Sequence, residues 1–428
     1  MKYKNILSLF LVGFSLQTFA QTGNIATSTT TGNSNIDITE QIGDGNTSSI
    51  TQIGNTNNTD VLQEGNTNAS VSLHDGNGNS SNVIQNGASN SSETTATGND
   101  NFSLALQGQN GGTSTNDQST ITQTGDDHVA ATLQGNNSAT SGNTATVTQE
   151  NGNANRAGIV QGEFPSAQMA MIGIPAAPFN PALSASIGGI ATITQSGNEN
   201  VAAIGQSDMS NLATISQVGE SNSSIVYQAT SNNIATSIQI GAMNRDLVVQ
   251  RSAGNTTLNT INGEGNITNT TQDVNTNNDA ELNIHGNSNL TTVSQSGMMN
   301  QNYLKIGNPM GQRPTGAQFS GTSQGNNAFI TQNGMGNTAS SFMEGINNTT
   351  QLFQSGTNNK SGSGILADGI QVSGLDNEVY GVQFGDDNIL DVNVAQDFNV
   401  VDVNQIGNGH SATVNIIGNN NEAVIIQN

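Results

Sequence analysis

Glutamine and asparagine recur at a fixed spacing through the middle of the chain. From residue 195 onward a glutamine comes every 11 residues, with Ile261 as the exception, and an asparagine follows each such position after five residues. Glycine stands two residues after every second glutamine slot, so the full repeat is 22 residues with two different turns. A fixed period of this size is typical of repeat architectures. The series comprises Gln195, Gln206, Gln217, Gln228, Gln239, Gln250 and Gln272, the asparagines Asn200, Asn211, Asn222, Asn233, Asn244, Asn255, Asn266 and Asn277, and the glycines Gly197, Gly219, Gly241 and Gly263.

Each 11-residue unit predicts a β-strand followed by a tight turn. Alternate residues of a strand share one face, and in the unit that starts at Asn200 this face carries Asn200, Ala202, Ile204 and Gln206. A helix would also require apolar residues at i+3 and i+4, which the units lack. We therefore predict an all-β fold, a two-sheet β-solenoid (β-helix) with 22 residues per rung from two 11-residue strand-turn units, stacked roughly 4.8 Å apart.

Stacked rungs would place identical amide side chains over one another. A buried amide without partners costs on the order of 1–3 kcal/mol. In a column of identical amides, each one donates to one neighbouring rung and accepts from the other. We expect Gln195 to lie over Gln217 and Gln239, and Gln206 to lie over Gln228, Gln250 and Gln272.

The repeated motif resembles a known family. Gln195-x-Gly197-x-x-Asn200-x-Ala202, followed after three residues by Gln206, resembles the curlin repeat of curli fibre subunits. The family usually opens the first strand with serine, whereas this chain has asparagine there, as at Asn211. The resemblance covers most of the chain after residue 35 and implies a structural subunit that polymerises outside the cell.

Similar units occur on both sides of this central array. In the first part, one expected column holds Gln41, Gln63, Gln85 and Gln107, while the other is degraded to Gln52, His74 and Ala96. All six prolines lie in two breaks, as expected if the remainder is strand, because proline cannot donate to a strand ladder. The first break predicts either a loop against the side of the solenoid or a contact site for a partner. The expected organisation is a signal peptide over 1–20, a flexible leader over 21–34, repeat arrays over 35–162, 191–307 and 321–428, and proline-containing insertions over 163–190 and 308–320.

The N-terminus predicts export. Lys2 and Lys4, the apolar run of residues 6–16 and the small residue Ala20 are typical of a secretory signal peptide. The apolar run is too short to span a bilayer, and we expect no integral membrane segment. The chain has no cysteine, so we expect no disulfides after secretion.

Composition and motifs argue against catalysis and against nucleic acid. The formal net charge is −23, whereas binding to nucleic acid needs basic patches. His74, His128 and His410 occupy slots of the repeat that belong to glutamine or asparagine, so we interpret them as substitutes for an amide. Phosphate-loop, nucleophile-elbow and zinc-ligand motifs are lacking. We expect no enzyme activity, no cofactor and no metal.

The resemblance implies a secreted subunit of curli-like amyloid fibres at the cell surface, which supports adhesion and biofilm formation. The implied partners are further copies of the chain, a nucleator subunit and an outer-membrane export channel. Two alternatives stay open: a monomeric β-solenoid adhesin, and an ice- or surface-binding protein. The second would need outward threonine pairs on every rung. Thr192 and Thr194 are followed after 22 residues by Thr214 and Ser216, but the pattern lasts only a few rungs.

Overall fold

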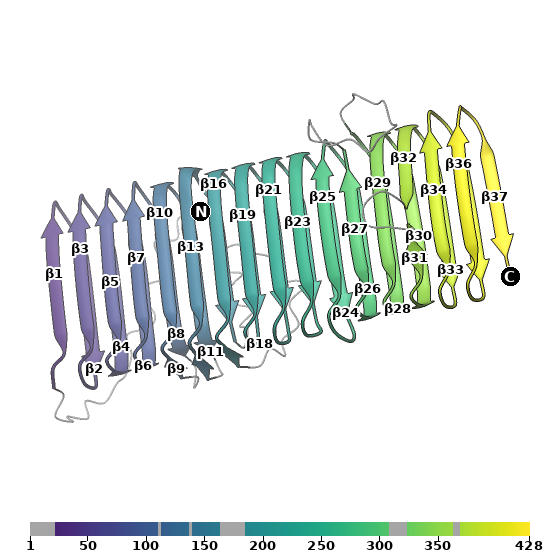
Figure 1. Cartoon of the computed structure of the whole chain (residues 1–428). Coiled ribbons are helices and arrows are strands. Elements are labelled where there is room, and N and C mark those ends of the chain that lie inside the picture. Colours follow the sequence, from purple (N-terminus) through teal and green to yellow (C-terminus); the bar gives the residue numbers. More distant parts are fainter. Residues whose placement is uncertain (1–21, 110–112, 137–138, 163–184, 308–322, 363–368) are drawn as a thin grey trace.

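The computed structural model describes residues 22–109, 113–136, 139–162, 185–307, 323–362 and 369–428. These residues form two long parallel β-sheets, sheet A and sheet B, which run along a rod from β1 to β37 (Figure 1). The chain alternates between the sheets, so one rung consists of a strand of sheet A followed by a strand of sheet B. The predicted all-β solenoid is confirmed.

Sheet A contains 17 strands, and each pairs in parallel with the strand of the next rung. They are β1 (Ile25–Thr31), β3 (Thr47–Ile53), β5 (Ala69–Asp75), β7 (Ser91–Thr97), β10 (Gln118–Asp126), β13 (Thr144–Asn153), β16 (Ile190–Asn198), β19 (Leu212–Glu220), β21 (Ile234–Ala242), β23 (Thr256–Glu264), β25 (Asp279–His285), β27 (Gln301–Ile306), β29 (Thr338–Ile346), β31 (Lys360–Ser361), β32 (Ile370–Leu375), β34 (Ile389–Ala395) and β36 (Ser411–Ile417).

Sheet B contains 20 strands, of which four are two-residue strands near the turns. They are β2 (Ile36–Ile42), β4 (Asn58–Asn66), β6 (Ser80–Ala88), β8 (Phe102–Gln109), β9 (Ser114–Thr115), β11 (Val129–Asn136), β12 (Thr140–Ser141), β14 (Arg156–Gln161), β15 (Ser186–Ile187), β17 (Val201–Gln206), β18 (Asp208–Met209), β20 (Ser223–Gln228), β22 (Arg245–Gln250), β24 (Ile267–Asp273), β26 (Leu290–Met298), β28 (Asn327–Met335), β30 (Thr349–Thr357), β33 (Glu378–Phe384), β35 (Val400–Ile406) and β37 (Glu422–Gln427).

The register of the sheets keeps like side chains together even where the sequence period is broken. Gln195 pairs with Gln217, and Gln217 with Gln239, at the expected 22-residue step. Gln149 of β13 pairs with Gln195 of β16, although they are 46 residues apart in the chain. The extra residues therefore leave the array at a turn, and the strands on either side remain in register.

The array begins earlier than the sequence pattern indicated. The expected flexible leader over 21–34 is wrong for the part that forms β1, because β1 pairs in register with β3 over its whole length. Asn24 already fills an asparagine slot, since its Oδ1 accepts the backbone N–H of Asn46 at 2.9 Å. Thr30 stands where other units have glutamine, opposite Gln52. This substitution hid the phase in the sequence.

One extra residue shifts the repeat between β24 and β25. The sequence pattern placed an asparagine slot at Asn277, but Asn278 occupies it. The backbone N–H of Asn278 donates to Oδ1 of Asn255 at 2.9 Å, whereas Asn277 lies exposed in the turn with a φ of 63°. A single inserted residue is accommodated in the turn, because the strands on both sides must keep their ladder bonds.

The two insertions expected around the prolines lie largely outside the described residues. The signal peptide expected over 1–20 lies outside them as well. After the first insertion the array resumes with β15, which pairs with β18 and so lies within the range expected as 163–190. The chain after the second insertion is described from residue 323, and β28 pairs there with β26.

The core between the sheets changes along the rod. Over the first rungs it is sparse, and its apolar residues are Ile50, Val61, Val83 and Ala105. From β10 to β22 it consists mainly of alanine, valine and isoleucine at the inner positions of both sheets. Beyond β23 a larger cluster runs from Ile261 to Ile416. The inner face predicted for the unit at Asn200 is the buried one, because Ala202 and Ile204 are both 0% exposed.

Candidate functional site

The inner face of sheet B carries one uninterrupted column of glutamines from β2 to β37. Each side-chain nitrogen donates to the amide oxygen of the next glutamine at 2.8 to 3.0 Å, always toward the C-terminal end. Between Gln107 and Gln206 the steps lengthen to 27, 27 and 45 residues, which concealed the continuity in the sequence. In order, the column comprises Gln41, Gln63, Gln85, Gln107, Gln134, Gln161, Gln206, Gln228, Gln250, Gln272, Gln295, Gln332, Gln354, Gln383, Gln405 and Gln427.

Each inner amide of this column uses both of its N–H groups, as Gln228 illustrates. Its Nε2 donates to Oε1 of Gln250 at 2.9 Å and to the backbone carbonyl of Leu212, in β19 of sheet A, at 3.1 Å. Its Oε1 accepts from Gln206 at 2.9 Å. The column therefore links rung to rung and sheet B to sheet A. No inner amide of the column is left without hydrogen bonds, which would cost about 1–3 kcal/mol for each unsatisfied buried group.

Sheet A carries the equivalent column over part of its length only. Gln123, Gln149, Gln195, Gln217 and Gln239 are joined by bonds of 2.7 to 3.1 Å. From the next rung onward, the position equivalent to these glutamines is apolar in every described sheet A strand that pairs at this position. Its occupants there are Ile261, Ile284, Ile306, Met343, Val372, Val394 and Ile416.

At the N-terminal end the sheet A column is interrupted by His74 and Ala96. His74 lies between Gln52 and Ala96 and is fully buried. Neither ring nitrogen has a hydrogen-bond partner in the described residues, and the amide oxygen of Gln52 has none there either. Burial lowers the pKa of His74 from 6.5 to about 4, so the ring is neutral at neutral pH. His74 fills the space of a glutamine without replacing its bonds.

Asparagines at the strand starts form a second type of ladder, beside the glycine turns. The backbone N–H of Asn222 donates to Oδ1 of Asn200 at 3.1 Å, and its Nδ2 donates to the carbonyl of Gly241 at 2.9 Å. Asn244 and Asn266 repeat the same contacts one and two rungs further on. The side chains thus hold each turn against the turn of the next rung.

The asparagines beside the other turn make a related ladder. The backbone N–H of Asn233 donates to Oδ1 of Asn211 at 2.9 Å, and that of Asn255 donates to Oδ1 of Asn233 at 3.0 Å. Here the side-chain nitrogen turns back into its own turn, as in the bond from Asn233 Nδ2 to the carbonyl of Thr230 at 2.8 Å. The two turns of a rung are therefore stabilised differently, as the 22-residue sequence period indicated.

His128 shows how histidine serves in an asparagine slot. Its Nδ1 accepts the backbone N–H of Asn155 at 3.2 Å, which is the role of an asparagine oxygen in this ladder. The backbone N–H of His128 donates to Oδ1 of Asn101 at 2.9 Å. Burial lowers the pKa of His128 and keeps the ring neutral. This agrees with the interpretation of the ring as a substitute for an amide.

The turn glycines are required by both conformation and space. Gly219 has a φ of 118°, and a Cβ there would lie 1.9 Å from the carbonyl oxygen of Gly241. Gly197, Gly241 and Gly263 repeat this geometry, with φ values of 105°, 114° and 132°. Because the turns stack this closely, a side chain at any of these positions would push neighbouring rungs apart.

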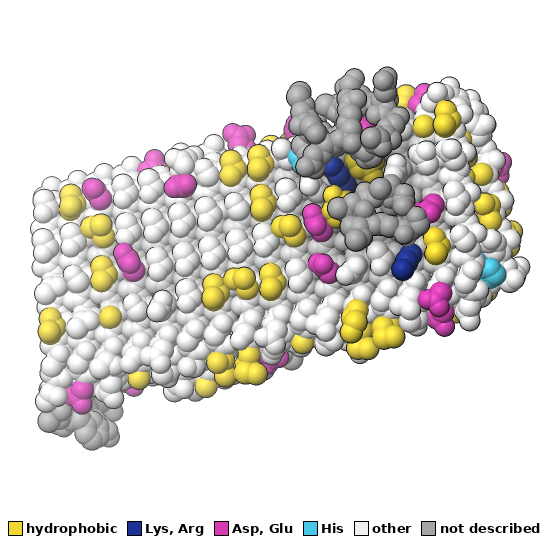
Figure 2. Space-filling view, viewed as in Figure 1, with side chains coloured by type: hydrophobic (Ala, Val, Ile, Leu, Met, Phe, Trp, Pro, Cys, Tyr) yellow, Lys and Arg dark blue, Asp and Glu magenta, His cyan; other side chains and the backbone are white. Residues whose placement is uncertain are grey.

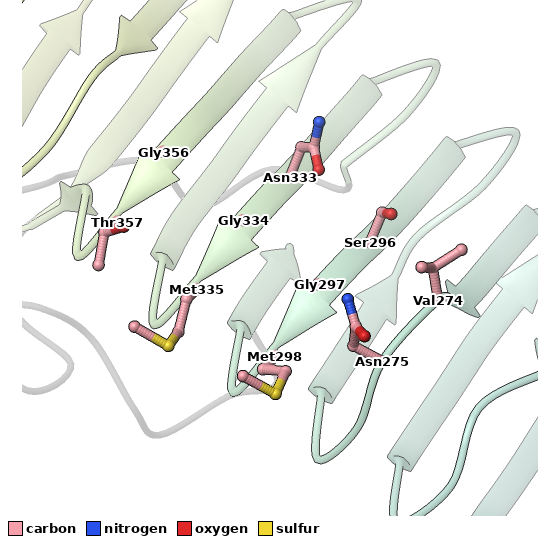
Figure 3. A pocket seen from close by; sticks show the side chains of 10 residues that line it. All are labelled: Val274, Asn275, Ser296, Gly297, Met298, Asn333, Gly334, Met335, Gly356 and Thr357. Carbon is pink, nitrogen blue, oxygen red and sulfur yellow. The ribbon is translucent and has the colours of Figure 1, made fainter.

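One surface depression among the described residues has no arrangement that suggests chemistry. It has a volume of about 320 Å³ and lies along the turns of β26, β28 and β30. Met298 and Met335, which pair in register, line it together with Val274 and the turn glycines Gly297, Gly334 and Gly356 (Figure 3). Within the described ranges, no group of three or more His, Asp or Glu side chains could hold a metal ion. The same ranges contain no helix of the length and apolarity needed to cross a membrane.

Comparison with known proteins identifies the repeat. Residues 209–241, which include β19, β20 and all of β21 except its last residue, match the family model described as the curlin associated repeat. No curated protein matches the chain. The matched segment lies where glutamine ladders run on both sheets, between Gln206 and Gln239. The resemblance to the curlin-repeat family is thus confirmed, and the chain carries the curlin associated repeat as part of a β-solenoid.

Proposed function

We propose that the chain is a secreted structural subunit that polymerises end to end into curli-like amyloid fibres of an extracellular matrix, where the fibres support adhesion and biofilm formation. The observation that carries this proposal is the continuous glutamine column of sheet B. All its bonds point the same way, so one outer rung offers amide acceptors and the other offers amide donors. A column of this kind gains one further set of bonds with each copy added.

The outermost described strands are complementary in register. The rod starts with a sheet A strand, β1, and finishes with a sheet B strand, β37, so a second copy would continue the alternation without a partial rung. Gln427 would donate to Gln41 of the second copy, as Gln405 donates to Gln427 at 2.9 Å. The Oδ1 of Asn421 would likewise accept the backbone N–H of Asn35 of the second copy, as Oδ1 of Asn399 accepts the backbone N–H of Asn421 at 3.0 Å. An edge strand with unpaired backbone groups is a ready template for such addition.

A proline in the last strand tests this end contact. The backbone N–H of Val400 donates to the carbonyl of Asn421 in the following rung at 2.8 Å. Glu422 holds the equivalent position one rung on, so its N–H points toward the rung that a second copy would supply. Glu422→Pro should remove this donor and block polymerisation, with little effect on the folding of the single chain. Glu422→Val, which retains the N–H, is the matched control.

The measurement is filament growth of the purified mature chain, followed by electron microscopy and fibre diffraction. The expected result is filaments with spacings of roughly 4.8 and 10 Å for the unchanged chain and for Glu422→Val. Glu422→Pro should stay monomeric with the same circular dichroism spectrum. Equal growth of both variants would show that copies do not join through β37.

The cellular part of the proposal follows from the sequence and the family. The predicted signal peptide supports secretion, and the acidic charge of −23 is compatible with a soluble chain before assembly. The curlin associated repeat supports a role as a fibre subunit, with an export channel and a nucleator subunit as partners. Expression with and without residues 1–20, followed by fractionation of cells and medium, tests whether this segment directs export.

A second candidate function, binding to an ordered solid surface such as ice, is favoured by one observation. The outer face of sheet A holds a grid of paired hydroxyl residues on four successive strands, because the register bridges breaks in the sequence period. Figure 2 shows this side of the rod as regular rows of uncharged polar side chains with few acidic ones. The threonine grid comprises Thr120, Thr122, Thr146, Thr148, Thr192, Thr194, Thr214 and Ser216.

The threonine grid is larger than the sequence period indicated, and a direct assay tests it. β-Branched side chains are stiff, so the grid would present hydroxyl and methyl groups at a fixed strand spacing of about 4.8 Å. If it binds ice, the mature chain should inhibit ice recrystallisation, and Thr146→Lys with Thr192→Lys should abolish the effect. Thr292→Lys on the outer face of sheet B is the matched control. Absence of any effect of the unchanged chain would eliminate this candidate.

A further inference from the structure

A cleft with aromatic walls lies on the outer face of sheet B, toward the C-terminal end of the rod. It has a volume of about 260 Å³ and crosses the neighbouring strands β28, β30 and β33 (Figure 1). Each of these strands contributes one aromatic ring. The outward side chains that line this aromatic cleft are Phe329, Thr331, Gln351, Phe353, Tyr380 and Val382.

The register of the sheet places the three rings in a zigzag along the rod. In one outward column, Gln351 lies between Phe329 and Tyr380, and in the next column Phe353 replaces the aromatic residue on the middle strand. Phe353 is 39% exposed, so its ring is accessible and not part of the core. From β28 to β35 the zigzag and its C-terminal border span three strand spacings, or about 14 Å.

Polar residues bound the aromatic cleft on both sides along the rod. On the N-terminal side, the equivalent outward residues of β26 are Thr292 and Ser294. On the C-terminal side, those of β35 are Asp402 and Asn404. The rings therefore form a bounded area on a face that is otherwise polar at its borders.

Two carboxylates lie beside the ring of Tyr380. The hydroxyl of Tyr380 donates to Oε2 of Glu378 at 3.0 Å, and Asp402 pairs with Tyr380 in register on the next strand. Burial and then these two carboxylates raise the pKa of Tyr380, so the phenol keeps its proton. Among the described residues, neither Glu378 nor Asp402 forms a salt bridge.

The charge of this face favours a cationic ligand. The described strands of sheet B from β24 to β37 contain neither Lys nor Arg. Aromatic rings attract a cation through the negative charge of their faces, and nearby carboxylates add to this attraction. A ligand that complements the aromatic cleft therefore combines positive charge with apolar faces that can stack on rings.

We propose that the aromatic cleft binds a glycan of amino sugars whose amino groups are unacetylated and protonated. The C–H faces of its pyranose rings would stack on Phe353 and its aromatic neighbours. Its hydroxyl groups would bond to Gln351 and Thr331, and its ammonium groups would lie next to Glu378 and Asp402. A length of about 14 Å exceeds that of one sugar ring, so an oligomer fits better than a single sugar.

A basic peptide would satisfy the charge, but the sheet is less suited to it. Extended peptides usually bind to a sheet through the free backbone groups of an edge strand. β30 is paired on both sides, with β28 and with β33, so the aromatic cleft offers side chains only. A glycan needs no backbone partner.

The inference does not rest on polymerisation, because the aromatic cleft lies on the side of a single rod. If the chain also forms fibres, the cleft would recur once in every copy. Linked sites of this kind raise the overall affinity for a long glycan without any new contact.

Calorimetric titration of the mature chain tests the proposal. The ligand is a β-1,4-linked tetramer of glucosamine, at a pH at which its amino groups carry protons. The N-acetylated tetramer and the corresponding tetramer of glucose are the neutral comparisons. We expect the glucosamine tetramer to bind about tenfold more tightly than either neutral tetramer.

Variants of the aromatic cleft separate stacking from charge. Phe353→Ala should weaken binding of the glucosamine tetramer about tenfold, whereas Phe353→Tyr, which keeps the ring, should bind like the unchanged chain. Asp402→Asn should weaken binding about threefold. The matched controls are Phe398→Ala, in the exposed turn before β35, and Glu220→Gln, at the exposed end of β19 in sheet A. Both controls should leave binding unchanged, and circular dichroism should show the same β spectrum for every variant.

Three results would overturn the proposal. The first is lack of binding by the unchanged chain, or full binding by Phe353→Ala. The second is equal affinity for the glucosamine tetramer and its acetylated form, because the carboxylates would then have no role. The third is equal or tighter binding of a lysine tetramer, which would assign the aromatic cleft to basic peptides.

Discussion

The two sheets fill equivalent inner positions of their strands with different side chains. In sheet B, glutamine occupies the slot on every rung from Gln41 to Gln427, while in sheet A it occupies five successive rungs and then gives way to Ile261 and further apolar residues. Both columns are buried and both run beside an intact backbone ladder. The backbone ladder therefore does not require glutamine in either sheet. The difference between the two columns must arise from the interactions of the side chains.

The contrast shows that one amide column is sufficient to link the rungs. Where sheet A turns apolar, the core cluster between Ile261 and Ile416 replaces amide bonds by burial, which contributes about 25 cal/mol per Å² of apolar surface. At His74 and Ala96, sheet A has neither an amide column nor a large apolar cluster. The core there is small, and polar groups remain unsatisfied in the described residues. We infer that the rungs up to β8 are the least stable part of the rod.

Breaking the sheet B column should have the largest effect. Gln228→Leu would leave the amide of Gln206 without its acceptor and the oxygen of Gln250 without its donor. Two unsatisfied buried groups should lower the free energy of unfolding by about 4 kcal/mol. Denaturant unfolding of the monomeric Glu422→Pro background measures this loss without interference from polymerisation. A loss below about 1 kcal/mol would mean that the sheet B amides are dispensable.

Repair of the sheet A column should stabilise the first rungs in a pH-dependent manner. The pKa of buried His74 falls from 6.5 to about 4, so the folded state favours the neutral ring. The neutral His74 ring therefore contributes its full stability above pH 6.5, and this contribution is lost as the pH falls from 6.5 toward 4. His74→Gln removes the loss and restores amide partners for Gln52, and it should raise stability by about 2 kcal/mol at pH 5.

Hydrogen exchange resolved along the chain measures this change where it occurs. The amides of β3, β5 and β7 should exchange more slowly in His74→Gln than in the unchanged chain at pH 5, and those of β34 should not change. Equal protection of both proteins at pH 5 would contradict the assignment of His74 as a defect of the sheet A column.

An acid in an asparagine slot beside sheet A should have a smaller effect. Asp117 follows Asn90 and precedes Asn143 in one ladder and accepts the N–H of Asn143 at 2.8 Å. Burial raises the pKa of Asp117, although hydrogen bonds from Ser114 and Thr140 oppose this shift. Stability is therefore complete below the usual value of 3.8 and decreases as the pH rises through the raised pKa.

Asp117→Asn should remove this penalty. We expect a higher free energy of unfolding at neutral pH, by less than for His74→Gln at pH 5, because the neutral amide has no buried charge. We expect no gain below pH 3.8, where the carboxyl is already neutral. Denaturant unfolding at several pH values checks both parts. A gain that is the same at all pH values would show that ionisation of Asp117 is not its cause.

Shifting the end of the sheet A column by one rung should have the smallest effect. Gln239→Ile would place the apolar boundary at Gln217, which keeps its bond to the carbonyl of Val201 at 3.0 Å. Since Ile261 is already apolar, we expect a loss of less than about 1 kcal/mol in the same denaturant assay. A loss as large as that of Gln228→Leu would remove the proposed difference between the two sheets.

The sequence predicted those features that depend on the period, and it missed those that depend on breaks in it. The 11-residue phase predicted the strand faces and the stacking of Gln195 on Gln217, because a regular rung leaves the chain no other register. It did not reveal that Gln107 and Gln206 belong to one column, since insertions of unpredictable length lie between them. A slot filled by an unusual residue, such as Thr30, removed the signal for β1. The period also did not predict that outward-facing apolar residues of β20 and β22, such as Tyr227 and Val249, are buried.

End-to-end polymerisation is tested most directly by a cryo-electron microscopy structure of filaments grown from the mature chain. We expect rods that follow one another in the same direction without a gap. Gln427 of one copy should lie at hydrogen-bond distance, about 2.9 Å, from Gln41 of the next. Filaments in which the rods meet side by side, or in which the sheet B glutamine column stops at each end of a copy, would contradict it.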